Sequence, residues 1–118
     1  MARPVDPQCR TFNLAIELLA RPWTALILNA LQPGPLRFSQ IGAQVRGVGD
    51  KVLSARLKEL EVHGLVIRRV EPGPPVRVGY ELTQPGRAFG EVAAAVERWG
   101  RQLVPADEAE SRPRRRSG

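Results

Sequence analysis

Side chains suited to covalent or metal chemistry are scarce in this chain of 118 residues, which holds one cysteine, Cys9, and one histidine, His63. One residue of each type cannot form a disulfide within the chain or a zinc site of the common kinds. The sequence also lacks the glycine-rich phosphate-binding motifs and the G-x-S-x-G motif of a serine nucleophile. We therefore predict no catalytic residue, no cofactor and no metal site, so the chain is not expected to be an enzyme.

The basic residues show a more informative spacing. Lys51, Ser54 and Lys58 are three and four residues apart, so a helix would place them on one face, together with Ala55. Hydrogen-bond donors of this kind bind the phosphates and base edges of nucleic acids. A solvated helix face is the alternative, because it explains most surface lysines. On the opposite face the same helix would direct three leucines to the core: Leu53, Leu57 and Leu60.

Several helices are needed to position this basic face. Apolar spacing and capping residues predict helices over residues 11–20, 22–32, 39–47 and 50–62. Pro22 is expected in the first turn of the second helix, with Leu26 on its apolar face. Ser39 is expected to cap the third helix, and Gly64 to end the fourth, in the position that often follows the last helical residues.

A hairpin and a last helix are expected to follow. Residues 65–70 and 76–82 are rich in β-branched residues and flank a proline-rich turn, which predicts a β-hairpin. Thr83 would cap the last helix, which ends before Pro105 and carries one apolar stripe: Phe89, Val92, Ala93, Val96, Trp99, Gly100 and Leu103. Residues 106–118 are charged and expected to be disordered, which leaves one domain over residues 1–105.

Two short helices followed by a hairpin predict a winged helix-turn-helix fold, mainly α with a small β-hairpin wing. In that fold the second helix of the pair, here the one with the basic face, enters the major groove of DNA. The charge distribution agrees, because residues 36–77 hold eight basic and four acidic residues, whereas residues 78–111 hold three and six. The net charge of +6 includes four arginines within residues 112–118. Because Arg68, Arg69 and Arg77 extend the basic surface onto the hairpin, the sequence predicts a nucleic-acid-binding domain.

An ordered set of motifs between Cys9 and Leu103 resembles the HxlR-type family of bacterial transcriptional regulators. The matching segments are Cys9, Trp23-Thr24, Leu26-Ile27-Leu28, Leu36-Arg37-Phe38-Ser39, Ile41, Lys51-Val52-Leu53-Ser54, Arg56-Leu57-Lys58-Glu59-Leu60, Gly64-Leu65-Val66, Val76, Tyr80-Glu81-Leu82-Thr83, Gly86 and Trp99. The resemblance implies a homodimer that binds an inverted-repeat operator in double-stranded DNA and usually represses a neighbouring gene. It also implies that the first and last helices form the subunit interface. We assign this interface to Phe12, Ile16, Phe89, Val92, Val96, Trp99 and Leu103. The alternative for the apolar stripe of the last helix is packing inside the monomer.

The DNA contacts are predicted from the basic face of the helix and from the hairpin. We expect Lys51, Ser54 and Lys58 to line the major groove. Ala55 stands where the family tends to have a longer polar residue, and its methyl group could contact thymine. Phosphate contacts are assigned to Ser39, Gln40, Arg56, Arg69 and Arg77. Arg56 lies near the core edge of its helix and could instead pair with a carboxylate.

The cysteine that matches Cys9 is a redox or electrophile sensor in some relatives of the family, so the resemblance makes Cys9 a candidate sensor for a small electrophile or an oxidant. It stands beside Arg10, ahead of the expected first helix. The alternative is that Cys9 is a small buried apolar residue, which is the common state of a lone cysteine.

No apolar run approaches the roughly 18 residues that a membrane span requires, and residues 1–10 lack the apolar stretch of a secretory signal. We therefore expect a cytoplasmic protein without a membrane partner. Two other functions also fit a basic winged helix: nonspecific binding of DNA or RNA, and binding of another protein without nucleic acid.

Overall fold

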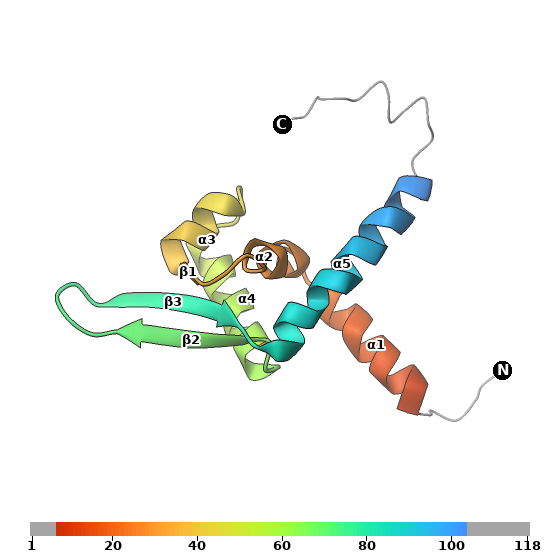
Figure 1. Ribbon diagram of the computed structural model, residues 1–118, viewed down its shortest axis with the longest axis horizontal. Coiled ribbons are helices and arrows are strands. Elements are labelled where there is room, and N and C mark those ends of the chain that lie inside the picture. The colour runs from red at the N-terminus through yellow and green to blue at the C-terminus, as the bar shows by residue number, and fades with distance from the viewer. Residues whose placement is uncertain (1–6, 104–118) are drawn as a thin grey trace, which may run out of the picture.

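The computed structural model describes residues 7–103, which form five helices around one small antiparallel sheet (Figure 1). The elements are α1 (Pro7–Ala20), α2 (Thr24–Ala30), β1 (Leu36–Arg37), α3 (Phe38–Gln44), α4 (Asp50–Val62), β2 (Val66–Glu71), β3 (Arg77–Leu82) and α5 (Gln84–Leu103). This order confirms the winged helix-turn-helix prediction, with α3 and α4 as the helix pair and β2 and β3 as the wing. The predicted end of the last helix at Pro105 and the charged segment of residues 106–118 lie outside the described residues.

The hydrophobic core lies where α2, α3 and α4 meet the sheet. Leu53, Leu57 and Leu60 are fully buried on one face of α4, as their spacing predicts. They belong to one cluster with the other buried apolar residues: Ile27, Leu28, Leu31, Ile41, Val45, Val66, Tyr80, Leu82 and Phe89. Because α4 is anchored by its leucine face, its opposite face is held toward solvent in a fixed orientation.

The end of α4 shows how the chain turns into the wing. Gly64 adopts a left-handed φ of 75°, and the next amide, that of Leu65, donates a hydrogen bond of 2.9 Å to the Leu60 carbonyl. The Gly64 amide bonds the Glu61 carbonyl at 3.0 Å, so the two bonds form a Schellman motif that satisfies the last carbonyls of the helix. The prediction that Gly64 ends this helix is confirmed.

The start of α5 is fixed by Thr83 and by a close backbone approach. The Thr83 hydroxyl accepts a hydrogen bond of 3.2 Å from the Gly86 amide, which confirms Thr83 as the cap. The Gly86 backbone lies so close to the Leu65 carbonyl that a Cβ atom at this position would collide with it. Because glycine has no Cβ atom, the first turn of α5 can approach the backbone of Leu65, which lies between α4 and β2.

Several local predictions are wrong. The first helix begins at Pro7, so Cys9 lies inside its first turn rather than ahead of it. Pro22 lies outside α2, which begins at Thr24 after Trp23 takes a left-handed φ of 76°. Leu26, expected on the apolar face of α2, is exposed, whereas Leu28 is buried. This apolar helix has more than one possible apolar stripe, and periodicity alone cannot choose between them.

The third helix and the sheet also differ from prediction. The cap of α3 is Arg37 rather than Ser39, and the Arg37 amide donates a hydrogen bond of 2.8 Å to Oε1 of Gln40. The sheet has a third strand, β1, and its order is β1-β3-β2. A strand of two residues is too short to show alternation, so the sequence does not reveal it. The expected strand residue Val76 lies just before β3 and is exposed.

The two terminal helices leave the body of the molecule on the side opposite the hairpin (Figure 1). α1 packs against α2, and α5 packs against α2 and β3. None of the helices within residues 7–103 combines the length and apolar character needed to cross a membrane.

Candidate nucleic-acid interface

The solvent face of α4 forms one wall of an open groove of about 630 Å³. Lys51, Ser54, Ala55 and Lys58, which the sequence predicts as base-contacting residues, all line this groove. Arg68 of β2 also lines it, with Glu61 and Tyr80. The structure thus brings the predicted α4 residues together beside a strand of the wing, with three cationic side chains in one depression.

The strand register decides which arginines of the wing can reach this groove. Arg68 is paired with Tyr80, whose buried side chain belongs to the core. Arg69 is paired with Gly79, and neighbouring residues of a strand point to opposite faces of a sheet. Arg68 therefore shares the sheet face that packs on α4, whereas Arg69 and Arg77 lie on the other face. Arg68 is an additional candidate for contact with DNA. Only the register of β2 with β3 identifies it.

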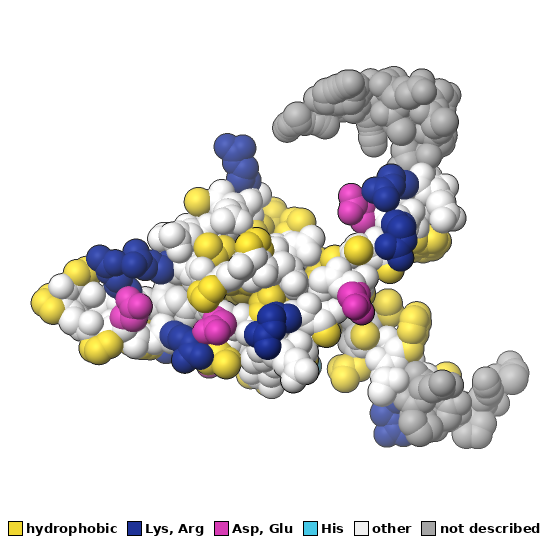
Figure 2. Space-filling model, viewed as in Figure 1, with side chains coloured by type: hydrophobic (Ala, Val, Ile, Leu, Met, Phe, Trp, Pro, Cys, Tyr) yellow, Lys and Arg dark blue, Asp and Glu magenta, His cyan; other side chains and the backbone are white. Residues whose placement is uncertain are grey.

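The outer face of the sheet carries a second, smaller depression of about 330 Å³. Its polar lining includes Arg37, Gln40, Arg69, Glu71 and Arg77. In Figure 2, basic and acidic side chains lie next to one another over the hairpin. Arg37 was not among the predicted residues, because its position depends on the short strand β1. This face brings Gln40 and Arg77 together but mixes both signs of charge.

Arg69, a predicted phosphate ligand, is held in an ion pair within the chain. Its Nε donates to Oε1 of Glu81 at 2.6 Å, and the two side chains form an ion pair. Because the ion pair neutralises its charge and the residue faces away from the groove, Arg69 is poorly placed to bind the phosphates beside α4. Ser39 is exposed on the first turn of α3 and lines neither depression.

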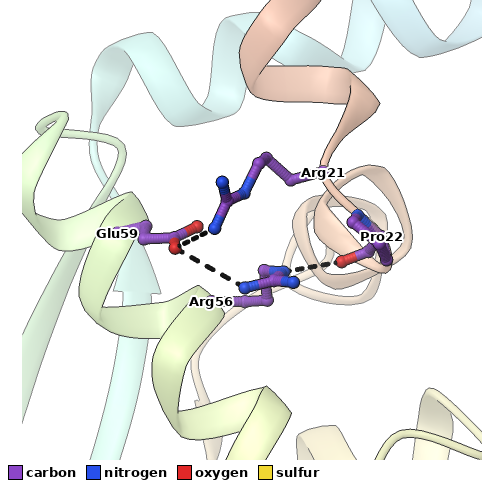
Figure 3. Close-up of polar contacts among 4 residues, drawn as sticks. All are labelled: Arg21, Pro22, Arg56 and Glu59. Atoms are coloured by element: carbon purple, nitrogen blue, oxygen red, sulfur yellow. Dashed lines mark hydrogen bonds and ion pairs between the residues drawn. The ribbon is translucent and has the colours of Figure 1, made fainter.

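Arg56, another predicted phosphate ligand, makes contacts within the chain and pairs with a carboxylate, as in the alternative. Its Nε donates to the Pro22 carbonyl at 2.9 Å, and its NH1 lies 3.5 Å from Oε2 of Glu59 (Figure 3). The same Glu59 oxygen lies 2.6 Å from NH2 of Arg21. The Arg56 side chain is only 14% exposed, so it is directed into the protein rather than toward a groove.

The terminal helices expose large apolar side chains. On α1 these are Phe12, Leu14 and Ile16, and on α5 they are Val92, Val96, Trp99 and Leu103. Trp99 is 61% exposed, whereas Phe89 is 9% exposed and belongs to the core of the single chain. The expected place of Phe89 in a subunit interface is therefore wrong, because the first turns of α5 are covered by α2 and β3. The other predicted interface residues are available to a partner.

Cys9 is exposed on the first turn of α1, the helix that carries Phe12 and Ile16. The alternative that Cys9 is a buried apolar residue is therefore wrong. A reagent in solution can reach its thiol, and any group added there would lie on the same helix as the exposed apolar residues.

Comparison with known proteins places this geometry in a family. Residues 18–108 match the model of the HxlR-like helix-turn-helix family. The chain is 40% identical over 96 residues to YvaP of Bacillus subtilis, an uncharacterized HTH-type transcriptional regulator, covering 81% of this chain and 89% of YvaP. It is 38% identical over 98 residues to the HTH-type transcriptional regulator YodB of Bacillus subtilis, covering 83% and 88%.

The fold agrees with solved structures of the same relative. The reduced form of YodB superimposes with a TM-score of 0.72 and 36% identity, over 84% of this chain and 94% of that one. Quinone-bound YodB gives a TM-score of 0.71 at 35% identity, over 80% and 99%. With the family model, the sequence relatives and the fold in agreement, this chain belongs to the HxlR-like helix-turn-helix family of transcriptional regulators.

Proposed function

We propose that the chain acts as a homodimer that binds an inverted-repeat operator in double-stranded DNA and represses transcription of a neighbouring gene. The observation that carries this proposal is the groove beside α4, where Lys51, Ser54, Ala55 and Lys58 lie opposite Arg68. In this proposal α4 enters the major groove and its side chains contact base edges. The sugar–phosphate backbone of one DNA strand lies between α4 and β2. Ser39 and Gln40 would contact flanking phosphates. Arg77, which lies next to the hairpin turn and has no ion pair within residues 7–103, would contact phosphates farther along the DNA from the outer face of the sheet.

The second part of the proposal is the dimer. A chain of this size seldom leaves seven large apolar side chains exposed on two helices that both pack on α2 unless another surface covers them. A second copy is the occupant we propose, because a two-fold axis would cover α1 and α5 of both chains at once and would present two α4 helices to a palindrome. The two half-sites would then lie about 34 to 36 Å apart, or a multiple of that distance.

Variants of two adjacent arginines of β2 test the proposed position of the DNA backbone. Arg68→Ala should weaken binding to every DNA sequence and lower the slope of log affinity against log salt by about one unit, because one phosphate contact is lost. Arg69→Ala is the matched control, since Arg69 is paired with Glu81 and faces the other side of the sheet. It should leave the slope unchanged. Fluorescence anisotropy at several salt concentrations measures the affinity and its salt slope for each variant. Equal slopes for the two variants would reject the proposed position of the DNA backbone.

We also propose that modification of Cys9 releases the operator. The YodB relatives include quinone-bound and diamide-treated forms, and Cys9 of this chain is exposed on α1. An adduct on the first turn of α1 would disturb the proposed dimer interface and thereby the separation of the two α4 helices.

Treatment with a quinone or with diamide should lower operator affinity at least about tenfold in the wild type and should leave Cys9→Ser unaffected; tenfold corresponds to about 1.4 kcal/mol of coupling. Affinity is measured before and after treatment. Mass spectrometry confirms that the thiol has reacted. An unchanged affinity of the modified wild type, or an equal loss in Cys9→Ser, would contradict the switch.

A further inference from the structure

A hollow separates α1 from α4. A depression of about 340 Å³ lies between α1 and α4 and is lined by Leu14, Glu17, Leu18, Arg21, Glu59 and His63. The backbone of α1 packs on α2 and makes only sparse contact with α4. Leu18 and Leu19 of α1 pack against the core cluster that contains the α4 leucines, and the polar contacts that cross this boundary add directional constraints on α4.

Those polar contacts meet at one carboxylate. Arg56 and Glu59 come from α4, while Arg21 and Pro22 come from the turn that follows α1 (Figure 3). Arg56 holds the Pro22 carbonyl at 2.9 Å with Nε and lies 3.5 Å from Glu59 with NH1, and Glu59 lies 2.6 Å from Arg21. We call these four residues the clamp. The clamp joins α4 directly to the segment between α1 and α2.

The two clamp residues of α4, Arg56 and Glu59, alternate along the helix with the residues of the groove. Arg56 follows Ala55, and Glu59 follows Lys58, so the two sets occupy different faces of the same two turns. A rotation or a slide of α4 that breaks the clamp would therefore displace the groove residues by a comparable amount. No residue of the clamp needs to touch DNA for this effect.

We propose that Arg56 and Glu59 are positioning residues that set the orientation of α4 relative to α1, and with it the half-site separation that the dimer prefers. This inference rests on the proposed operator-binding function. The clamp residues differ in expected importance. Arg56 is largely shielded from water and donates to a carbonyl, so its contact is the stronger one. The Arg21–Glu59 pair is more exposed, and exposed ion pairs contribute little by themselves.

The first experiment measures spacing preference. A palindromic duplex is selected from random DNA by the wild-type chain, and its half-sites are then moved one or two base pairs closer or farther apart. The wild type should prefer the selected spacing strongly. Arg56→Lys keeps the charge but loses Nε and the planar fork, and should reduce that preference about tenfold, the equivalent of one charged hydrogen bond. Glu59→Gln should reduce it less, and Arg21→Gln least.

The control is Glu17→Gln, which neutralises another carboxylate in the same hollow but makes no ion pair within residues 7–103. It should keep the wild-type spacing preference. Affinity for a duplex with a single half-site should stay within about twofold for Arg56→Lys, because the groove residues are unchanged. A general loss of folding would instead lower the affinity for every duplex together.

The second experiment needs no DNA. Spin labels at Asn13→Cys on α1 and Val62→Cys on α4, in a Cys9→Ser background, report the distance between these helices within one chain. Unlabelled Cys9→Ser chain is added in excess so that few dimers carry two labelled copies. One narrow distance distribution is expected, and Arg56→Lys should broaden or shift it while Glu17→Gln should not.

The two experiments separate the inference from the function on which it rests. If the wild type selects no palindrome, the proposed function fails, and the spin-label distances still decide whether the clamp orients α4. If the wild type has a clear spacing preference but Arg56→Lys and Glu59→Gln keep that preference and the narrow distribution, the clamp does not position α4 and the inference is overturned.

Discussion

A Val96→Asp variant should remain a folded monomer and lose about 100-fold or more of its operator affinity. Val96 lies midway along α5 and is 53% exposed in the single chain, so a carboxylate there stays solvated while the chain is alone. In a dimer the same carboxylate would be buried against the apolar residues of the partner, and a second copy would suffer the same cost by symmetry. A monomer binds one half-site only and loses the gain from joint binding of two sites.

Ala94→Asp supplies the matched control for this prediction. Ala94 is exposed on the same helix, on the side away from the apolar stripe. An alanine-to-aspartate change costs at least as much helix propensity as the change at Val96, so general weakening of α5 would affect the control equally or more. Sedimentation velocity and circular dichroism distinguish the variants. A dimeric, operator-binding Val96→Asp protein would show that this face of α5 does not form the interface.

The size of the expected effect comes from the area that the terminal helices expose. Trp99 is 61% exposed, and burying such a side chain contributes about 2 to 3 kcal/mol in each chain of a dimer. Phe12, Ile16 and Leu103 are between 49% and 66% exposed and lie on the same two helices. One charge at the middle of this surface opposes the burial of several side chains at once, which is why Val96 is the position chosen.

The sequence predicts the parts of the fold that depend on local periodicity. The three leucines of α4 lie on one face within two turns, and packing then leaves Lys51 and Lys58 toward solvent, as expected. Gly64 and Thr83 end and begin helices by local hydrogen bonds, so they too can be recognised from their neighbours. The predicted groove residues of α4 therefore come together in the structure.

Features that depend on distant partners are not predictable in this way. Arg56 and Lys58 are both basic residues of α4, and only the distant Pro22 carbonyl shows that Arg56 turns inward. Arg68 and Arg69 differ by one position, and the sheet register decides which of them faces α4. Phe89 has the same spacing as Val92 and Val96, but the start of α5 is held on the core where Gly86 approaches Leu65.

The central claim, sequence-specific operator binding, predicts a large difference between two DNA molecules. A dimer that places two α4 helices in successive major grooves should prefer its palindrome to an unrelated duplex of the same length by about 10³-fold or more at physiological salt. Phosphate contacts alone give no such preference, because every duplex offers the same charges. If phosphate contacts alone held the DNA, the basic groove would bind all duplexes equally and weakly.

The most direct test is a gel-shift titration of the full chain with the DNA that flanks its own gene, with unlabelled unrelated duplex as competitor. We predict one discrete complex that survives about a thousandfold excess of unrelated DNA and is displaced by a small excess of the same flanking DNA. Equal displacement by both competitors would show a nonspecific nucleic-acid binder. No complex with any duplex would show that the winged helix binds another kind of partner, and either result would contradict the operator-binding function.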